Sequence, residues 1–293
     1  MMNPFKSIPA GLAILSEINR FNKMAPQFEA LRKEGKFEEE RALILEGTGR
    51  FADTVSRKIG ITFDIHGEEN IPDHGPILIV ANHQSYADIL AMIYVIRKFQ
   101  IGFIAKSEFT GFKPLAKAIN YTRSLFLKRG DARAAIQTLN EAATLMKEGF
   151  SLVIFPEGTR SQCSEMGEFK AGSFKFAQKA KVPILPITLE GGYHFWEEKG
   201  TVQPCTVHVK IHPLVHFEEM DRKTQNNAHV EIENTIREGL KEVVEFYFVM
   251  NTETLGKEPE MPGSFFIVFF FSAYQSNRFS LLENILSCSY YNY

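Results

Sequence analysis

The chain has 293 residues, of which 44% are hydrophobic and 23% are charged, and its formal net charge is -2. This size accommodates one large core, or a core domain with a smaller appendage. The near-neutral balance excludes bulk binding to nucleic acid, which requires a strongly positive field. No run reaches the roughly eighteen apolar residues that a membrane-spanning helix requires, so we expect no transmembrane segment.

Residues 1–60 are predicted to be helical, because Leu12, Leu15 and Ile18 recur at about the spacing of one helix face. Two interpretations remain open for this region. The helices form a pair packed on its own core, or they form an interfacial hairpin that places apolar side chains in lipid.

Residues 61–250 alternate between short apolar runs and helical segments. The runs are nearly continuous in hydrophobicity, as in strands that are buried on both faces, and they lie at 77–81, 101–105, 124–127, 152–155 and 182–189. A helix is predicted over 132–148, with Asp131 as its N-cap and Gly149 at its end. We therefore predict an α/β fold with a mixed, largely parallel sheet flanked by helices, and an N-terminal helical membrane-docking appendage.

Residues 251–293 differ in composition from the rest of the chain. Residues 264–274 hold five phenylalanines, and little charge follows them. The predicted organisation is thus a helical region (1–60), a catalytic domain (61–250) and a tail of unassigned role (251–293).

Residues 83–88 read H-Q-S-Y-A-D and follow the predicted strand 77–81. His83 then lies at the carboxyl end of a strand, where open α/β sheets bind their ligands. On a regular helix an offset of five residues turns through about 500°, so the side chains of His83 and Asp88 would not lie on the same face. They meet only if His83 precedes the helix and Asp88 lies in its first turn, as a cap at Ser85 would arrange. Asp88 then orients the imidazole, and the free ring nitrogen can remove a hydroxyl proton.

Simpler explanations exist for some of these residues. Ser85 and Asp88 also fit a capping box. Three histidines recur at four-residue steps on or beyond an alternating strand at 207–211: His208, His212 and His216. We predict outward-facing surface histidines there, and we expect no metal site.

Residues 155–160 read F-P-E-G-T-R and follow the buried run 152–155. Gly158 lets the backbone approach an anion closely, Thr159 can donate a hydrogen bond, and Arg160 offers a bidentate guanidinium. An ordinary turn with a surface arginine is the alternative.

Two further cations, Lys106 and Arg129, lie at or just beyond predicted strand ends. In a parallel sheet these ends meet at one edge, so we expect one base and three cations to converge there. The segment from Arg97 to Arg133 carries nine Lys or Arg against Glu108 and Asp131, which suits a solvated face, an anionic substrate or a lipid surface equally. No nucleophile paired with a histidine is evident, which favours direct transfer over a covalent acyl-enzyme.

Four segments together resemble the glycerolipid acyltransferases, specifically the 1-acylglycerol-3-phosphate acyltransferases. They occur in the family's order and cover roughly residues 60–220: N-H-Q-S-Y-A-D, K-S-E-F with a following F-L-K-R, F-P-E-G-T-R and V-P-I-L-P-I. The conjunction of the four is far more specific than any one of them.

The resemblance implies transfer of a fatty acyl group from acyl-CoA or acyl carrier protein to the sn-2 hydroxyl of 1-acylglycerol-3-phosphate, on the cytoplasmic face of a membrane. His83 is then the base and Asp88 its orienter. The acceptor's glycerol phosphate is bound by residues 157–160, which are Glu157, Gly158, Thr159 and Arg160, with Lys106 and Arg129 assisting. No cofactor beyond the acyl thioester substrate is implied.

Three alternatives remain open at this point. In the first, the acceptor is another lysophospholipid or an amino-lipid, and the chemistry is unchanged. In the second, the protein is a thioesterase in which water replaces the acceptor, and such an enzyme would not need three convergent cations. In the third, the protein binds lipid without catalysis, and it would not need Asp88 behind His83.

Overall fold

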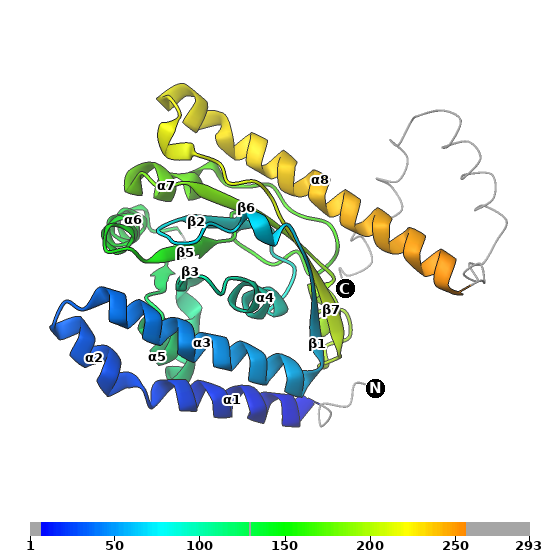
Figure 1. Ribbon diagram of the computed structural model, residues 1–293, viewed down its shortest axis with the longest axis horizontal. Coiled ribbons are helices and arrows are strands. Elements are labelled where there is room, and N and C mark those ends of the chain that lie inside the picture. Colours follow the sequence, from blue (N-terminus) through cyan, green and yellow to red (C-terminus); the bar gives the residue numbers. More distant parts are fainter. Residues whose placement is uncertain (1–6, 129, 256–293) are drawn as a thin grey trace.

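The computed structural model describes residues 7–128 and 130–255 (Figure 1). Arg129 and the tail from residue 256 onward, including the Phe-rich segment, lie outside the described residues. Within the described ranges, no helix combines the length and the apolar character needed to cross a membrane.

A seven-stranded sheet forms the centre of the structure, in the order β1-β7-β6-β2-β5-β3-β4. Its neighbours pair in parallel except for β6 and β7, which are antiparallel, so the predicted mixed, largely parallel sheet is confirmed. The strands are β1 (Ile61–His66), β2 (Leu78–Ala81), β3 (Ile101–Lys106), β4 (Leu125–Leu127), β5 (Ser151–Ile154), β6 (Ile184–Glu190) and β7 (Cys205–Ile211).

Helices cover both faces of this sheet (Figure 1). One core joins one sheet face to α3 (Phe37–Ile59) and α4 (Ala87–Val95). The other core joins the opposite face to α6 (Ala132–Lys147), α7 (Lys175–Ala180) and α8 (Arg222–Leu255). Every residue of β2, β5 and β6 is buried, which explains why these strands are apolar without alternation.

The boundaries of several elements follow from local sequence. The carboxylate of Asp131 accepts a hydrogen bond from the N–H of Ala134 at 3.0 Å, so the predicted cap of α6 is confirmed. Gly149 follows the helix with φ of 89°, a conformation that favours glycine. β7 alternates between buried and more exposed residues, as its sequence predicted.

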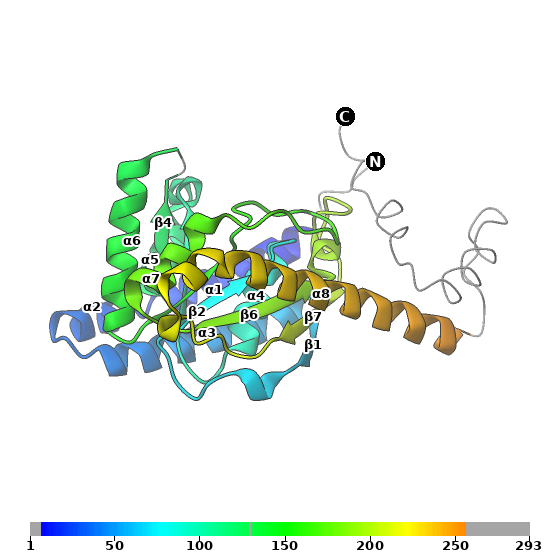
Figure 2. The same cartoon turned by 90° about the horizontal axis from the view of Figure 1, so that it is seen from above.

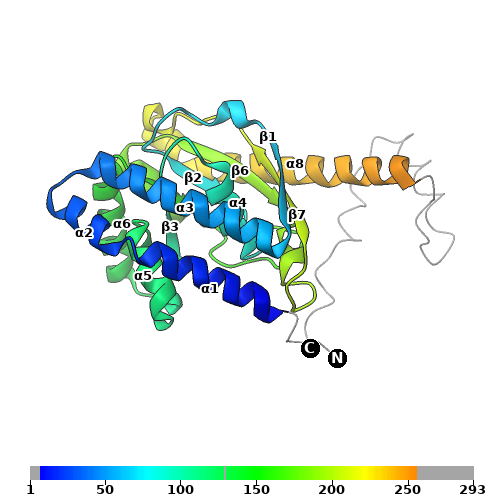
Figure 3. The same cartoon turned by 60° about the horizontal axis from the view of Figure 1, so that its bottom comes forward.

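The N-terminal helices α1 (Ile8–Asn22), α2 (Ala25–Lys33) and α3 are present and share a core with the rest of the fold. Phe21, Phe28 and Ile44 pack with residues of α5 (Lys113–Tyr121) and α6. Figure 3 shows α1 running beside α3 on the outer side of the molecule. The predicted apolar stripe is divided, because Ile18 is buried while Leu12 is 62% exposed.

A buried ion cluster also ties these helices to the sheet. Glu40 of α3 is fully buried, and it accepts hydrogen bonds from Arg32 of α2 and from Arg123, which lies just before β4. The nitrogen–oxygen distances are 2.5 Å and 2.6 Å. Removing one member would leave an uncompensated buried charge, which is strongly destabilising.

The C-terminal helix α8 is the longest helix among the described residues. It packs on β6 and continues past residue 251 to Leu255, and Figure 2 shows its end projecting beyond β1 and β7.

The prediction of surface histidines is wrong for His212. This residue is buried, and its Nε2 lies 2.8 Å from the hydroxyl of Thr188. Burial lowers the pKa of His212 to about 4, which keeps the ring neutral. His208 is half-buried beside Asp64, while His216 is largely exposed.

Candidate active site

The two motif loops meet because their strands are neighbours. β2 pairs in parallel with β5, so the loops that follow both strands leave the same edge of the sheet side by side. Two backbone hydrogen bonds join the loops: Ser161 N–H donates to the carbonyl of His83 at 2.8 Å, and Gln162 N–H donates to the carbonyl of Gln84 at 3.2 Å.

His83 and Asp88 form a hydrogen-bonded dyad. The distance from Nδ1 of His83 to Oδ2 of Asp88 is 2.8 Å. His83 precedes α4 and Asp88 lies in its first turn, which is the arrangement that their spacing required. The Asp88 side chain is fully buried, whereas 15% of the His83 side chain is exposed.

Asp88 also organises the start of α4. Its Oδ2 accepts hydrogen bonds from the N–H groups of Gln84 and Ser85, at 2.6 Å and 2.8 Å, while the Ser85 hydroxyl accepts from Ala87 N–H at 3.1 Å. The carboxylate oxygen that orients His83 therefore also accepts from the backbone N–H of Ser85, while the N-cap of α4 itself is Tyr86, one residue later than the sequence predicted. Three donors on that oxygen fix the carboxylate against the imidazole.

The imidazole of His83 is held on its face as well as its edge. Its ring stacks on Phe155, with centroids 4.0 Å apart and planes inclined by 15°. None of the residues described here hydrogen-bonds to Nε2 of His83. That nitrogen is left to act on a substrate, which is the geometry of a general base.

Glu157 points into the protein rather than toward a substrate. Its Oε1 accepts a hydrogen bond from His83 N–H at 2.6 Å, and its Oε2 accepts one from Gly167 N–H at 2.7 Å. Only 5% of the residue is exposed, and burial raises the pKa of Glu157 to about 7. The structure therefore places Glu157 as a support for the backbone of the dyad histidine.

The next two residues form the predicted turn. Gly158 has φ of 70°, and its N–H donates to the carbonyl of Phe155 at 3.0 Å. A side chain at this φ would be strained, so the position favours glycine. Thr159 is exposed on this turn.

Arg160 is partly exposed and tightly held. Its Nη1 donates to Oε1 of Glu197 at 2.5 Å, and its guanidinium carbon lies 3.7 Å from the centroid of the Tyr86 ring. A quarter of the side chain, 26%, remains exposed. The guanidinium of Arg160 thus lies against Tyr86, a residue that stands between His83 and Asp88 in the chain.

Lys106 lies at the end of β3, on the same edge of the sheet as the two loops. Its side chain is 43% exposed and pairs with Glu108 at 3.3 Å. β5 separates β3 from β2, so Lys106 ends a strand that is not a neighbour of the strand before His83.

Sequence reasoning missed two acidic residues that border the loops. Glu190 ends β6 and accepts hydrogen bonds from Gln84 Nε2 at 2.5 Å and from Ser164 Oγ at 2.9 Å. Burial raises its pKa. Glu197 holds Arg160 from the segment that follows β6. The only sequence signal for either was its position after the run 182–189.

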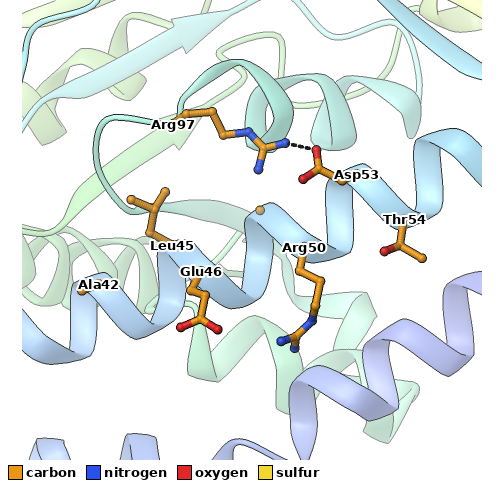
Figure 4. Close-up of a pocket in the computed structure, with 8 residues that line it drawn as sticks. Ala42, Leu45, Glu46, Arg50, Asp53, Thr54 and Arg97 are labelled. Atoms are coloured by element: carbon orange, nitrogen blue, oxygen red, sulfur yellow. Dashed lines mark hydrogen bonds and ion pairs between the residues drawn. The ribbon is translucent and has the colours of Figure 1, made fainter.

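A separate depression of about 520 Å³ is lined by residues of α3 and by Arg97 (Figure 4). Arg97 and Asp53 form an ion pair beside it at 2.6 Å. Arg97 follows the C-terminal end of α4, whereas the dyad lies at the N-terminal end of that helix. The depression is therefore distinct from the candidate site.

The chain is similar to known acyltransferases. Residues 62–190 match the family model described as Acyltransferase. A protein named 1-acyl-sn-glycerol-3-phosphate acyltransferase, chloroplastic, from Brassica napus is 34% identical over 161 residues, covering 54% of this chain and 46% of that protein. A probable 1-acyl-sn-glycerol-3-phosphate acyltransferase from Mycoplasma pneumoniae is 32% identical over 193 residues, covering 60% of this chain and 71% of that protein.

A solved structure shares the fold. The crystal structure of the 1-acyl-sn-glycerophosphate acyltransferase PlsC from Thermotoga maritima aligns with a TM-score of 0.62 and 26% identity, covering 80% of this chain and 97% of that chain. The chain spans about half the length of the first curated relatives that it matches.

Proposed function

The chain belongs to the acyltransferase family, and from this premise we propose that it transfers a fatty acyl group to the sn-2 hydroxyl of 1-acylglycerol-3-phosphate, giving phosphatidic acid for phospholipid synthesis. The acyl donor is the thioester of acyl-CoA or of acyl carrier protein. The observation that carries the proposal is the dyad of His83 and Asp88, with Arg160 held beside it on the neighbouring loop.

His83 acts as the general base in this proposal. Its Nε2 removes the proton from the acceptor hydroxyl as the oxygen attacks the thioester carbonyl. The tetrahedral intermediate collapses to the ester, and the departing thiolate takes the proton back from the imidazolium. Asp88 fixes the tautomer of His83 and stabilises its positive charge during the step.

The phosphate of the acceptor binds at the F-P-E-G-T-R turn. Nε and Nη2 of Arg160 form no hydrogen bond to the described residues, so this edge of the guanidinium is available for two phosphate oxygens. The exposed Thr159 hydroxyl and the Gly158 backbone complete the turn, and Lys106 and Arg129 add positive charge. Glu157 contributes to this site through the backbone it holds.

The membrane surface is a partner in this proposal, on its cytoplasmic face. Ile8 and Leu12 lie one turn apart on α1 and are 49% and 62% exposed, which suits contact with lipid. An acceptor with a long acyl chain stays partly in the bilayer when the enzyme lies at the interface. The basic residues between 97 and 133 favour an anionic surface.

Product identification tests this function directly. Purified protein is incubated with an acyl thioester and a panel of lysolipids, and the products are identified by mass, with His83→Ala as the control. We expect phosphatidic acid from lysophosphatidate and about 10²–10⁴-fold less from the variant. If the protein acylates another lysolipid faster than lysophosphatidate, that lysolipid is the acceptor. Release of free fatty acid with every acceptor would identify a thioesterase, and no turnover at all would leave a lipid-binding protein.

A further inference from the structure

Glu197 joins the two motif loops although it belongs to neither. It lies just after the short 3-10 helix η5 (Gly192–Phe195), in the segment that follows β6. Its side chain is only 1% exposed. Removing a carboxylate from water costs free energy unless it is paired and hydrogen-bonded. The partners of Glu197 therefore show which groups it holds in place.

Three donors surround the carboxylate. Arg160 Nη1 donates to Oε1 at 2.5 Å, and Ser85 Oγ donates to Oε2 at 2.6 Å. Tyr86 N–H lies 3.3 Å from Oε1. Glu197 thus connects the arginine of one loop to the start of α4, where the dyad aspartate lies.

The Tyr86 ring completes the arrangement. It is 45% exposed and lies against the guanidinium of Arg160, whose central carbon is 3.7 Å from the ring centroid. The ring fixes the plane of the guanidinium, and the carboxylate fixes its rotation within that plane. The remaining edge of Arg160 is then directed away from Glu197.

We propose that Glu197 is a positioning residue for acceptor recognition, which orients the free edge of Arg160 toward the phosphate of the acceptor. This inference rests on the proposed function. Arginine has a long, flexible side chain, and a bidentate bond to phosphate forms only when its planar fork is correctly aligned. Glu197 supplies that alignment before the acceptor arrives.

The carboxylate has a second, opposing effect on phosphate binding, because its negative charge offsets the charge of Arg160. Two conservative substitutions separate orientation from charge. Glu197→Asp keeps the charge but withdraws the carboxylate by one methylene. Glu197→Gln keeps the reach and an acceptor oxygen for Arg160 but removes the charge.

Steady-state kinetics of acyl transfer to lysophosphatidate provide the test. We expect Glu197→Asp to raise the acceptor KM about tenfold or more, in line with the loss of a charge-assisted hydrogen bond, with the donor KM unchanged. Glu197→Gln should keep the acceptor KM at or below the wild-type value. Glu198→Gln is the matched control, because the neighbouring Glu198 is 40% exposed and pairs with His194 instead.

A double-substitution cycle distinguishes positioning from general support of the loops. If Glu197 acts through Arg160, Glu197→Asp should have no further effect on the acceptor KM once Arg160→Ala is present. An equal rise in both backgrounds would overturn the proposal, and so would a fall in the acceptor KM for Glu197→Gln together with no change for Glu197→Asp.

Glycerol 3-phosphate binding keeps this inference distinct from the proposed function. Titration calorimetry of the wild type, Glu197→Asp and Glu197→Gln measures phosphate recognition without turnover. If the wild type acylates no lysophosphatidate, the proposed function fails, whereas weaker binding by Glu197→Asp alone still supports the positioning role. Equal binding by all three proteins would refute the positioning role even if acyl transfer is confirmed.

Discussion

Replacing Asp88 by Asn changes the charge of the dyad with little change in its shape. The amide oxygen of Asn can occupy the place of Oδ2, which accepts from His83 and from two backbone N–H groups. Oδ1 has no hydrogen-bond partner among the described residues, so the amide nitrogen displaces no bond there. The substitution therefore isolates the electrostatic contribution of Asp88 to catalysis.

The size of this contribution follows from the distance. Nδ1 and Oδ2 are 2.8 Å apart, which places the centres of the two charges about 4 Å apart when His83 is protonated. At an effective dielectric constant of about 20, the attraction is about 4 kcal/mol. Since about 1.4 kcal/mol corresponds to tenfold in rate, Asp88→Asn should lower kcat by about 10³-fold.

Thiol release from acyl-CoA, measured with saturating acceptor, gives kcat for the wild type and the variant. Thermal unfolding shows whether the variant is folded. Asp73→Asn is a suitable control, because Asp73 is 86% exposed and pairs with Lys98 away from the dyad. A folded Asp88→Asn protein whose kcat lies within about tenfold of the wild type would refute the assignment of Asp88 as the group that stabilises the imidazolium.

Three further predictions concern the surroundings of the dyad and the membrane contact. Because burial raises the pKa of Glu157 from 4.5 to about 7, the folded state binds this proton more tightly than the unfolded state, and on the order of 3 kcal/mol of stability is lost as pH rises between these values. Urea unfolding at pH 5 and pH 8 should show that the free energy of unfolding falls less for Glu157→Gln than for the wild type. An equal fall in both proteins would contradict this reasoning. Gly192→Ala should lower kcat and the melting temperature, because a Cβ there would lie 2.5 Å from the dyad carboxylate, whereas Gly172→Ala, with open space around it, should do neither. Leu12→Glu should reduce flotation with anionic vesicles, and Ile136→Glu, at a residue 60% exposed on α6, should not; equal effects would argue against docking through α1.

Point substitutions suit the last test better than truncation. Removing residues 1–50 would also remove Phe21, Phe28 and Ile44 from a core that α5 and α6 share. It would leave Arg123 without its buried partner Glu40. Loss of activity after such a truncation would report on folding as much as on membrane contact.

The sheet and the dyad could be predicted from the sequence because both depend on local patterns. Continuous apolar runs marked strands that the structure buries on both faces, and the spacing of His83 and Asp88 allowed contact only across a helix start. The parallel pairing of β2 and β5 then brought both motifs together. Each of these inferences needed only neighbouring residues and one rule about strand ends.

The supporting carboxylates could not be predicted in the same way. Glu197 contacts residues 37 and 112 positions away in the chain, and Gln84 lies 106 positions from Glu190. Such pairs follow from the strand order, which the alternation of strands and helices leaves open. Glu157 illustrates a second limit, because its place in F-P-E-G-T-R does not reveal that its side chain turns inward onto the His83 backbone.

Acidic and basic residues thus have different positions in this site. The side chains of Asp88 and Glu197 are almost fully buried, and so is the residue Glu157. Each of the three carboxylates accepts hydrogen bonds from neighbouring residues of the site. Arg160 and His83 retain exposed surface and free nitrogen atoms. Because the substrates proposed here bring an anionic phosphate to the site, an exposed carboxylate beside the imidazole would repel them. Enclosure directs each carboxylate at a donor of the site instead: Asp88 holds the imidazole of His83, Glu157 holds the backbone of His83, and Glu197 holds Arg160.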